Sequence, residues 1–331
     1  MATIGNNNPT YADVAKRLDP NGKVETIVEM LNEDNEVLND ATVIEGNLPT
    51  GHRTTVRTGL PTATWRKLNY GVAKSKSQTA QVQDSCGMLE AYAEVDKALA
   101  DLNGNTSAFR LSEDRAFLEA MNQEMATTLF YGDTDVDPEK FMGLTPRYDD
   151  TSAQNAVNLI NGGGAAGQTD CTSIWLINWD PNTCHLFYPK GSKAGWQHKD
   201  LGEETLTDAA GGYYQGYRTH YKWDLGLTLR DWRYVVRIHS IDTSTLVKDA
   251  ASGADLVDLL IQALEQVKGM RGRTVFYANR TITSYLRRQI LNVTNVRLSM
   301  DEVYGKKSVT VDGVPIRKTD ALLNTETSLN T

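Results

Sequence analysis

The stretch from Gly46 to Gln83 contains no acidic residue, although the chain as a whole has a net charge of −8. Its six basic residues are Arg53, Arg57, Arg66, Lys67, Lys74 and Lys76. Pro49, Gly51, Gly59 and Pro61 exclude a long helix in its first half. Because the stretch is also poor in apolar residues, we expect an extended hairpin that leaves the folded body and lies on another surface.

Two aromatic residues, Trp65 and Tyr70, lie within this basic stretch. Disordered segments are short of aromatic residues, so the pair argues against the main alternative, a disordered basic loop. The run from Thr62 to Val72 is strand-like. From Leu89 to Asp96, apolar and mostly charged residues alternate with the period of a half-buried strand.

The segment from Ser112 to Gly132 has the strongest helical pattern in the chain. Ser112 can cap its start, and Glu113 and Asp114 suit the positive end of the helix dipole. One apolar stripe follows at three- and four-residue steps: Phe117, Leu118, Met121, Met125 and Leu129. Such a stripe predicts a helix with one buried face. Gly132 is expected to end it in the left-handed conformation.

The other segments indicate mixed helix and strand. We expect a polar N-terminal arm over 1–22 and helices over 23–38, 153–160, 255–267 and 282–291. Strands are expected over 172–178, 225–229, 234–241, 274–277 and 309–311. The Tyr- and Gly-rich run from Leu206 to Tyr221 is expected to be a contact loop. The predicted class is therefore α+β.

The composition is that of a soluble globular protein, with 331 residues, 40% hydrophobic and 23% charged. The longest apolar runs, such as Ile174 to Ile177, are far too short to cross a bilayer. The N-terminus lacks the apolar region of a secretory signal. Three cysteines without framework spacing indicate reduced thiols in a cytosolic protein.

Candidate metal and nucleotide sites each lack a required feature. Asp133, Asp135 and Asp137 alternate, but Pro138 occupies the position where a calcium loop needs glycine. The run from Gly162 to Gly167 fits G-x-G-x-x-G, yet the expected helix precedes it and the strand follows, the reverse of a phosphate loop. We expect a solvated acidic turn and a flexible glycine-rich turn.

Zinc and catalysis are also disfavoured. Cys171, Cys184, His185 and His198 lack the paired spacing of structural zinc sites. The chain has no G-x-S-x-G, H-E-x-x-H or Walker motif, and its five histidines lie far apart in sequence. We predict no enzyme, no cofactor and no metal.

The order of these features resembles the major capsid proteins of tailed phages with the Hong Kong 97 fold, and most closely those of short-tailed phages of the epsilon15 and Bordetella phage type. The resemblance is carried by the stretches TIGNNNPTYADVAKRLDPNGK, FLEAMNQEMATTLFYGDTDVDPEKFMGL, RTVFYANR and GVPIRKTDALL. It covers nearly the whole chain, and its motifs are structural rather than chemical.

The resemblance implies an N-terminal arm over 1–45, an extension loop and strand over 46–97, a peripheral domain with a long spine helix over 98–250, and an axial domain over 251–331. Strands resembling the peripheral sheet precede the axial segment, so the element order is expected to be permuted. In this family the extension loop reaches over a neighbouring subunit. The implied contact residues are Arg53, Arg57, Trp65, Arg66, Lys67, Tyr70, Lys74 and Lys76.

The implied function is a major capsid protein that self-assembles into the icosahedral shell around the phage genome. Its implied partners are its own copies in hexamers and pentamers, a cement or decoration protein, a scaffolding protein, the portal and packaged double-stranded DNA on the inner face, with no membrane. It would be made in the bacterial host cytoplasm and reside in the virion capsid. The alternatives are an encapsulin-like cellular shell protein, a nucleic-acid-binding protein that uses the basic stretch, and a soluble enzyme.

Overall fold

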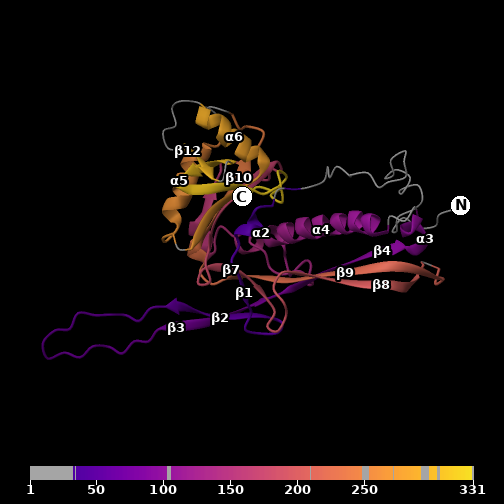
Figure 1. The fold of residues 1–331 in the computed structure, drawn as a ribbon. Helices are drawn as coiled ribbons and strands as arrows, with labels where there is room; N and C mark the ends of the chain where they lie inside the picture. The colour runs from indigo at the N-terminus through magenta and orange to yellow at the C-terminus, as the bar shows by residue number, and fades with distance from the viewer. Residues whose placement is uncertain are drawn as a thin grey trace. The chain divides into compact units, whose positions relative to one another are not determined.

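The computed structural model describes residues 33, 35–102, 106–208, 210–247, 253–270, 272–291, 298–303 and 306–329 (Figure 1). The expectations for 1–22 and for most of 23–38 lie outside these residues. The chain divides into two compact units. Unit 1 comprises residues 1–34, 88–126 and 195–224, and unit 2 comprises residues 35–87, 127–194 and 225–331.

Unit 2 is built around a mixed sheet. Its central strands are β6 (Cys171–Trp179), β10 (Val235–Asp242), β11 (Arg273–Ala278) and β14 (Val314–Lys318). β10 and β11 are both antiparallel to β6, and β14 is parallel to β11. The helices α5 (Leu256–Gln266) and α6 (Arg280–Leu291) pack on these strands through one continuous apolar core.

Both helices begin where the sequence provides a cap. The Asp255 carboxylate accepts the backbone N–H groups of Val257 and Asp258, at 3.2 and 3.3 Å, at the start of α5. Asn279 accepts the Ile282 N–H at 2.9 Å at the start of α6. The predicted helices over 255–267 and 282–291 and the strand over 274–277 are confirmed. Apolar residues at helical spacing, such as Leu256 and Leu260, face the core.

Unit 2 also contains shorter elements. They are α2 (Val37–Asp40), β1 (Val43–Glu45), β5 (Leu159–Asn161), β7 (Cys184–Tyr188), β12 (Leu298–Val303) and β13 (Lys306–Val311). The strands predicted over 225–241 divide between two elements. Residues 225–229 end the long strand β9 (Tyr213–Leu229), whereas β10 shares its core with α5 and α6.

Unit 1 contains a sheet and a long helix. The helix α4 (Thr106–Tyr131) and the strand β9 each run from one unit into the other. Within unit 1, β9 pairs antiparallel with β8 (Trp196–Thr207) and lies beside β4 (Gly87–Asp96). α4 packs on this sheet through Met121, which lies with Ala93 and Tyr221 in one buried cluster. The alternation predicted over 89–96 is confirmed by the burial of Ala93 and Val95.

The ends of α4 differ from the prediction. The helix begins at Thr106 rather than Ser112, because Phe109 is 3% exposed and its burial with Val95 and Leu99 extends the helix toward its N-terminus. Gly132 does not have a positive φ. A Cβ there would lie only 2.4 Å from the Phe141 carbonyl oxygen, so this glycine permits close backbone approach instead of a left-handed turn.

Three other predicted elements are wrong. The run from Leu206 to Tyr221 is mainly paired strand rather than loop, because Tyr217 and Tyr221 pack into the two clusters of unit 1. The segment over 153–160 is a short 3₁₀ turn (Gln154–Asn158) followed by β5. The buried Asn158 amide donates to the carbonyls of Trp232 and Val235 at 3.0 and 2.8 Å, which tethers this turn. Thr62 to Val72 forms no strand.

The glycine-rich run lies between two strands, β5 and β6, and no helix follows it. The N–H groups of Gly162 and Gly164 donate to the carbonyls of His239 and Ser240, each at 2.7 Å. A Cβ on Gly162 would meet Ile241 at 2.5 Å. The glycines therefore let this segment lie directly against β10.

Candidate interaction site

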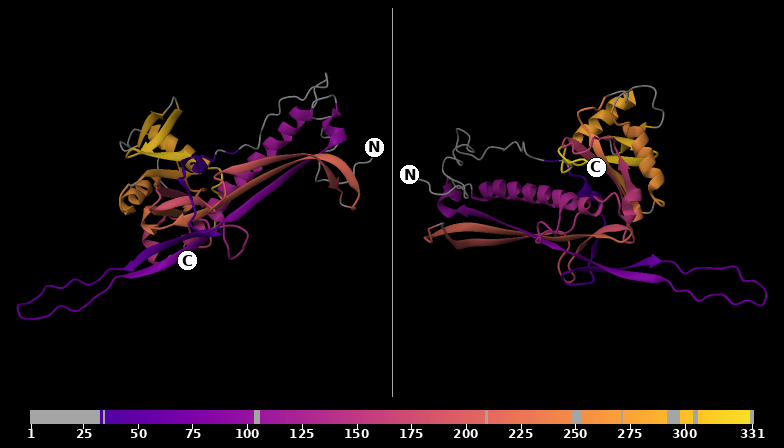
Figure 2. Two further views of the ribbon diagram at one scale, coloured as in Figure 1. Left: turned by 60° about the horizontal axis from the view of Figure 1, so that its bottom comes forward. Right: turned by 180° about the vertical axis from the view of Figure 1, so that it is seen from behind.

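The basic stretch forms a two-stranded hairpin. β2 (Gly51–Gly59) pairs antiparallel with β3 (Gln78–Ser85), from Gly51 opposite Ser85 to Gly59 opposite Gln78. Residues 60–77 continue beyond the last pair as a loop (Figures 1 and 2). Every residue from 60 to 83 is exposed. We call residues 46–83 the basic hairpin and residues 60–77 its tip.

The tip presents apolar side chains to solvent. Trp65 has 102% relative exposure and Tyr70 has 70%. The other large apolar residues exposed at the tip are Leu60, Leu68 and Val72. Local order there comes from the Tyr70 N–H, which donates to the Lys67 carbonyl at 3.2 Å, and from the Ser75 hydroxyl, which donates to the Thr62 carbonyl at 2.9 Å. A strand needs a neighbour to satisfy its backbone groups, and pairing ends at Gly59, which explains why Thr62 to Val72 is not one.

The root of the hairpin is held firmly. The buried Asp84 carboxylate pairs with Arg147 at 2.8 Å. The Asn47 side chain accepts the Arg53 N–H at 2.8 Å and donates to the Arg53 carbonyl at 2.6 Å. A Cβ on Gly51 would lie 2.2 Å from the Asp84 carbonyl oxygen, so only glycine fits this crossing. The root is therefore well anchored, whereas the tip is exposed.

Two histidines meet beneath the root. The ring centroids of His52 and His185 are 5.4 Å apart with edge-to-face geometry. His185 is fully buried, and neither ring nitrogen has a hydrogen-bond partner among the described residues. Burial lowers the pKa of His185 to about 4, and His52 adds to the shift. Burial, followed by the charge of Arg230, also lowers the pKa of His52.

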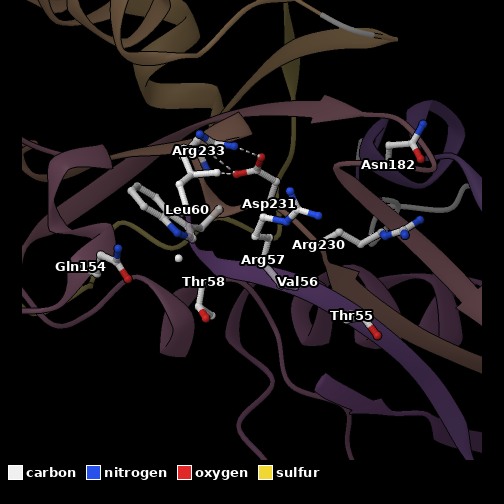
Figure 3. Close-up of a pocket in the computed structure, with 12 residues that line it drawn as sticks. Thr55, Val56, Arg57, Thr58, Leu60, Gln154, Asn182, Arg230, Asp231 and Arg233 are labelled. Carbon is white, nitrogen blue, oxygen red and sulfur yellow. Dashed lines mark hydrogen bonds and ion pairs between the residues drawn. The ribbon is translucent and has the colours of Figure 1, made fainter. Parts of the chain in front are cut away.

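A cavity of about 480 Å³ lies beside the second half of β2, from Thr55 to Gly59, and reaches Leu60 (Figure 3). Arg57, Arg230 and Arg233 line it. Arg233 makes a two-pronged contact with Asp231, through Nε at 2.9 Å and Nη2 at 2.7 Å. Asp231 is the only carboxylate among the residues that line the cavity. Its surface is therefore net positive, like the hairpin above it.

The predicted contact residues occupy two settings. Arg53 and Arg57 lie on β2, where the Arg53 guanidinium donates to Gln83 at 2.9 Å and Arg57 faces the cavity. The other six lie on the exposed tip: Trp65, Arg66, Lys67, Tyr70, Lys74 and Lys76. Sequence reasoning missed the Arg230–Arg233 segment, which lines the cavity beside β2. The only sequence feature that marks this segment is its two arginines in RDWR. That feature does not indicate which strand the segment will lie beside.

Unit 1 has the opposite charge. Residues 88–126 and 195–224 include 13 Asp and Glu against 6 Lys and Arg. Several of these acids are already paired: Glu94 contacts Arg218 at 2.7 Å, and Glu203 contacts Lys97 at 2.7 Å. The excess of acids nevertheless leaves this surface strongly negative. One chain thus contains both a positive hairpin and a negative surface.

The comparison with protein families decides between the functional classes. The family model described as major capsid protein GP7 matches residues 19–330. The chain belongs to this capsid protein family. A chain in the structure of bacteriophage epsilon15 is 39% identical to this chain, with 100% of both chains covered and a TM-score of 0.78. The search of curated proteins found no match to this chain.

Two more distant capsid chains were also found. The capsid of a native GTA particle is 12% identical, covers 71% of this chain and 99% of its own, and has a TM-score of 0.47. The bacteriophage JBD30 capsid is 10% identical, covers 88% and 92%, and has a TM-score of 0.48.

These findings confirm the predicted family, the α+β Hong Kong 97-type capsid fold and the structural role in a phage shell. The capsid protein self-assembles and resides in the virion capsid. The encapsulin-like and nucleic-acid-binding interpretations receive no support. Among the described residues, no helix is long and apolar enough to span a bilayer, and no group of three or more metal-binding side chains occurs.

Proposed function

We propose that the basic hairpin joins neighbouring copies of the capsid protein by lying on the acidic surface of residues 88–126 and 195–224 in another copy. The contact residues are those predicted from the sequence: Arg53, Arg57, Trp65, Arg66, Lys67, Tyr70, Lys74 and Lys76. The single observation that carries the proposal is the full exposure of Trp65 at the end of a hairpin without a single acidic residue. A subunit that assembles can bury this side chain against its neighbour.

Charge and apolar area play different parts in this contact. Complementary charge orients the approach and increases the association rate. Aromatic anchors surrounded by polar residues supply most of the affinity at protein interfaces. Trp65 and Tyr70 are such candidates, with basic residues on both sides of each in sequence. Closed symmetry then converts many modest contacts into a stable shell.

The finer organisation follows the resemblance and is part of the proposal. Copies form hexamers and pentamers around packaged double-stranded DNA, with a portal, a scaffolding protein and a cement protein as further partners. The proposed division is an arm over 1–45, an extension loop over 46–97, a peripheral domain over 98–250 and an axial domain over 251–331. The chain is made in the bacterial host cytoplasm. DNA that survives nuclease treatment of intact particles tests the packaging role.

Charge reversal on the tip tests the hairpin contact. We expect no closed particles from a variant with Arg66→Glu, Lys67→Glu and Lys74→Glu together, because the three new carboxylates repel the acidic surface of the other copy. The matched control is Lys190→Glu, Lys193→Glu and Lys268→Glu, three exposed lysines outside the tip with the same change in charge. Electron microscopy of both purified variants gives the readout. Normal shells from the tip variant, with circular dichroism unchanged, would refute the proposed contact.

A further inference from the structure

A second basic surface lies on unit 2, away from the hairpin in sequence. A groove of about 260 Å³ runs along helix α6 and the end of β14. Its lining consists of Arg280, Thr283, Ser284, Arg287, Arg288 and Lys318. We call it the α6 groove. Every residue that lines it has a cationic or hydroxyl side chain.

Within the part of the chain that the structure describes, most of this positive charge is not neutralised. Arg280 contacts Asp320, with Nη2 at 2.7 Å and Nε at 3.3 Å. Arg288 lies over the Tyr285 ring at 5.3 Å, which orients the guanidinium without cancelling its charge. Among the described residues, no carboxylate forms an ion pair with Arg287, Arg288 or Lys318. Among the described residues, the four cations of the groove are therefore paired with one carboxylate, that of Asp320.

Packing fixes which side of α6 presents these cations. Ile282 and Leu286 are fully buried in the core of unit 2. Arg280, Ser284 and Arg287 lie at steps of four and three residues along the opposite side of the helix, which places them in one row. Arg280 and Arg287 are about 10 Å apart along the helix axis, at 1.5 Å per residue. A DNA strand carries one phosphate per about 3.4 Å, so this row spans about three phosphates.

The α6 groove differs in chemistry from the basic hairpin. The hairpin combines its cations with Trp65 and Tyr70, whereas no apolar residue lines the groove. The centres of protein–protein interfaces are apolar and depleted of charged residues. Surfaces that bind nucleic acid are polar and strongly positive, and they contact phosphates through Arg, Lys, Ser and Thr. The groove has the composition of a surface that binds nucleic acid.

We propose that the α6 groove binds the phosphate backbone of nucleic acid without reading its sequence. The inference rests on the proposed function, in which the shell encloses DNA, and it names the residues that would contact this DNA. Arg287, Arg288 and Lys318 supply the principal phosphate contacts. Ser284 donates a further hydrogen bond. The net charge of −8 on the whole chain keeps the overall attraction weak.

The test compares the salt dependence of DNA affinity between two full-length variants. One carries Arg287→Gln, Arg288→Gln and Lys318→Gln, and the other carries Lys190→Gln, Lys193→Gln and Lys268→Gln. Both lose three positive charges and both keep the basic hairpin, so its contribution cancels. The affinity of unassembled protein for a fluorescent 20-base-pair duplex of arbitrary sequence is measured by anisotropy at several salt concentrations.

We expect the groove variant to reduce the slope of log affinity against log salt by about 2 to 3, since each lost phosphate contact contributes about 0.9. The control variant should keep the wild-type slope. Equal slopes for the two variants would overturn the proposal. A groove variant that keeps its DNA affinity but no longer forms particles would also overturn it, and would assign the groove to an acidic surface of another copy.

The packaging role is tested separately, by nuclease treatment of virions. Wild-type virions that lack nuclease-protected DNA would refute the packaging role on which this inference rests, whatever the slopes. Virions that contain DNA, combined with equal slopes, would remove only the assignment to α6. Inorganic phosphate and chloride, compared at the same ionic strength, should weaken DNA binding equally. The reason is that a row of cations recognises a polymer of phosphates rather than one ion.

Discussion

The basic hairpin and the C-terminal strap, residues Thr319–Leu329, are both extended segments, yet their partners differ. The strap is tied to its own unit along its length. Glu326 exchanges backbone hydrogen bonds with Cys171, at 2.9 and 3.2 Å. The Ser328 N–H donates to the Gln168 carbonyl at 2.7 Å. The hairpin has comparable ties only at its root.

The strap also carries a buried charge into unit 2. The Glu326 carboxylate accepts from the Arg237 guanidinium at 3.0 Å and from the Tyr131 hydroxyl at 2.5 Å. The Ser173 hydroxyl donates to the same carboxylate. Arg237 is 2% exposed and its guanidinium lies over the Trp175 ring at 5.3 Å. Burial and the charge of Glu326 raise the pKa of Tyr131, which keeps its hydroxyl protonated as a donor.

The comparison shows that the partner of an extended segment depends on which of its charged and apolar groups are left without contacts. A buried charge must be paired, and the strap finds its pairs within the chain. The tip of the hairpin leaves apolar rings and cations in water, so its favourable contacts require another molecule. Stability of the isolated subunit should therefore depend on the strap and on the root, whereas assembly should depend on the tip.

The largest expected effect is on the strap. Glu326→Ala leaves Arg237 buried without a counter-charge, which should reduce the free energy of unfolding by about 3–5 kcal/mol. Urea denaturation of unassembled protein measures the change. Asp320→Ala is the matched control, because Asp320 pairs with Arg280, whose side chain is 64% exposed, and such pairs contribute about 1 kcal/mol or less. Equal losses for the two variants would contradict this role of the strap.

The next effect concerns the root and depends on pH. The pKa of His185 falls from its ordinary 6.5 to about 4 in the folded protein, because burial disfavours the charged ring. Between these values the unfolded chain binds more protons, so stability is complete above about pH 6.5 and declines as the pH falls toward 4. His239 shifts in the same direction and to a similar value, also through burial.

His185→Phe should remove part of this acid sensitivity. A shift of this size corresponds to a loss of about 3 kcal/mol between pH 7 and pH 4. Urea midpoints at pH 7 and pH 4.5 give the comparison, and the variant should lose less stability on acidification than the wild type. His198→Phe, at an exposed position, is the control. Identical pH profiles for His185→Phe and the wild type would exclude His185 as the source.

Local patterns predicted the elements that depend on local causes. The alternation over 89–96 and the helices after Asp255 and Asn279 follow from side-chain spacing and caps within a few residues. The exposed position of Trp65 agrees with the charge of the sequence around it. Fold class and family were also accessible from sequence, the latter through resemblance rather than through physical reasoning.

The elements that sequence reasoning missed depend on distant neighbours. Phe109 extends α4 because it packs on Val95 and Leu99. Gly132 is required by the approach of Phe141, nine residues further along the chain, and no local pattern indicates that contact. The cavity beside β2 is also lined by the Arg230–Arg233 segment, about 170 residues away in sequence. The negative charge of unit 1 becomes visible only once its separate segments are known to fold together.

The smallest effect on the subunit should come from the tip. Trp65 contacts solvent over its whole surface, so Trp65→Ala should change the free energy of unfolding by no more than about 0.5 kcal/mol. If a neighbouring copy buries the ring, truncation should cost about 2 kcal/mol per contact. The concentration at which particles form, measured by light scattering, should then rise at least about tenfold. Val136→Ala is the control, since Val136 is 74% exposed outside the hairpin. A matching threshold for the two variants would show that Trp65 remains in water in the shell, and the contact would then depend on the cations alone.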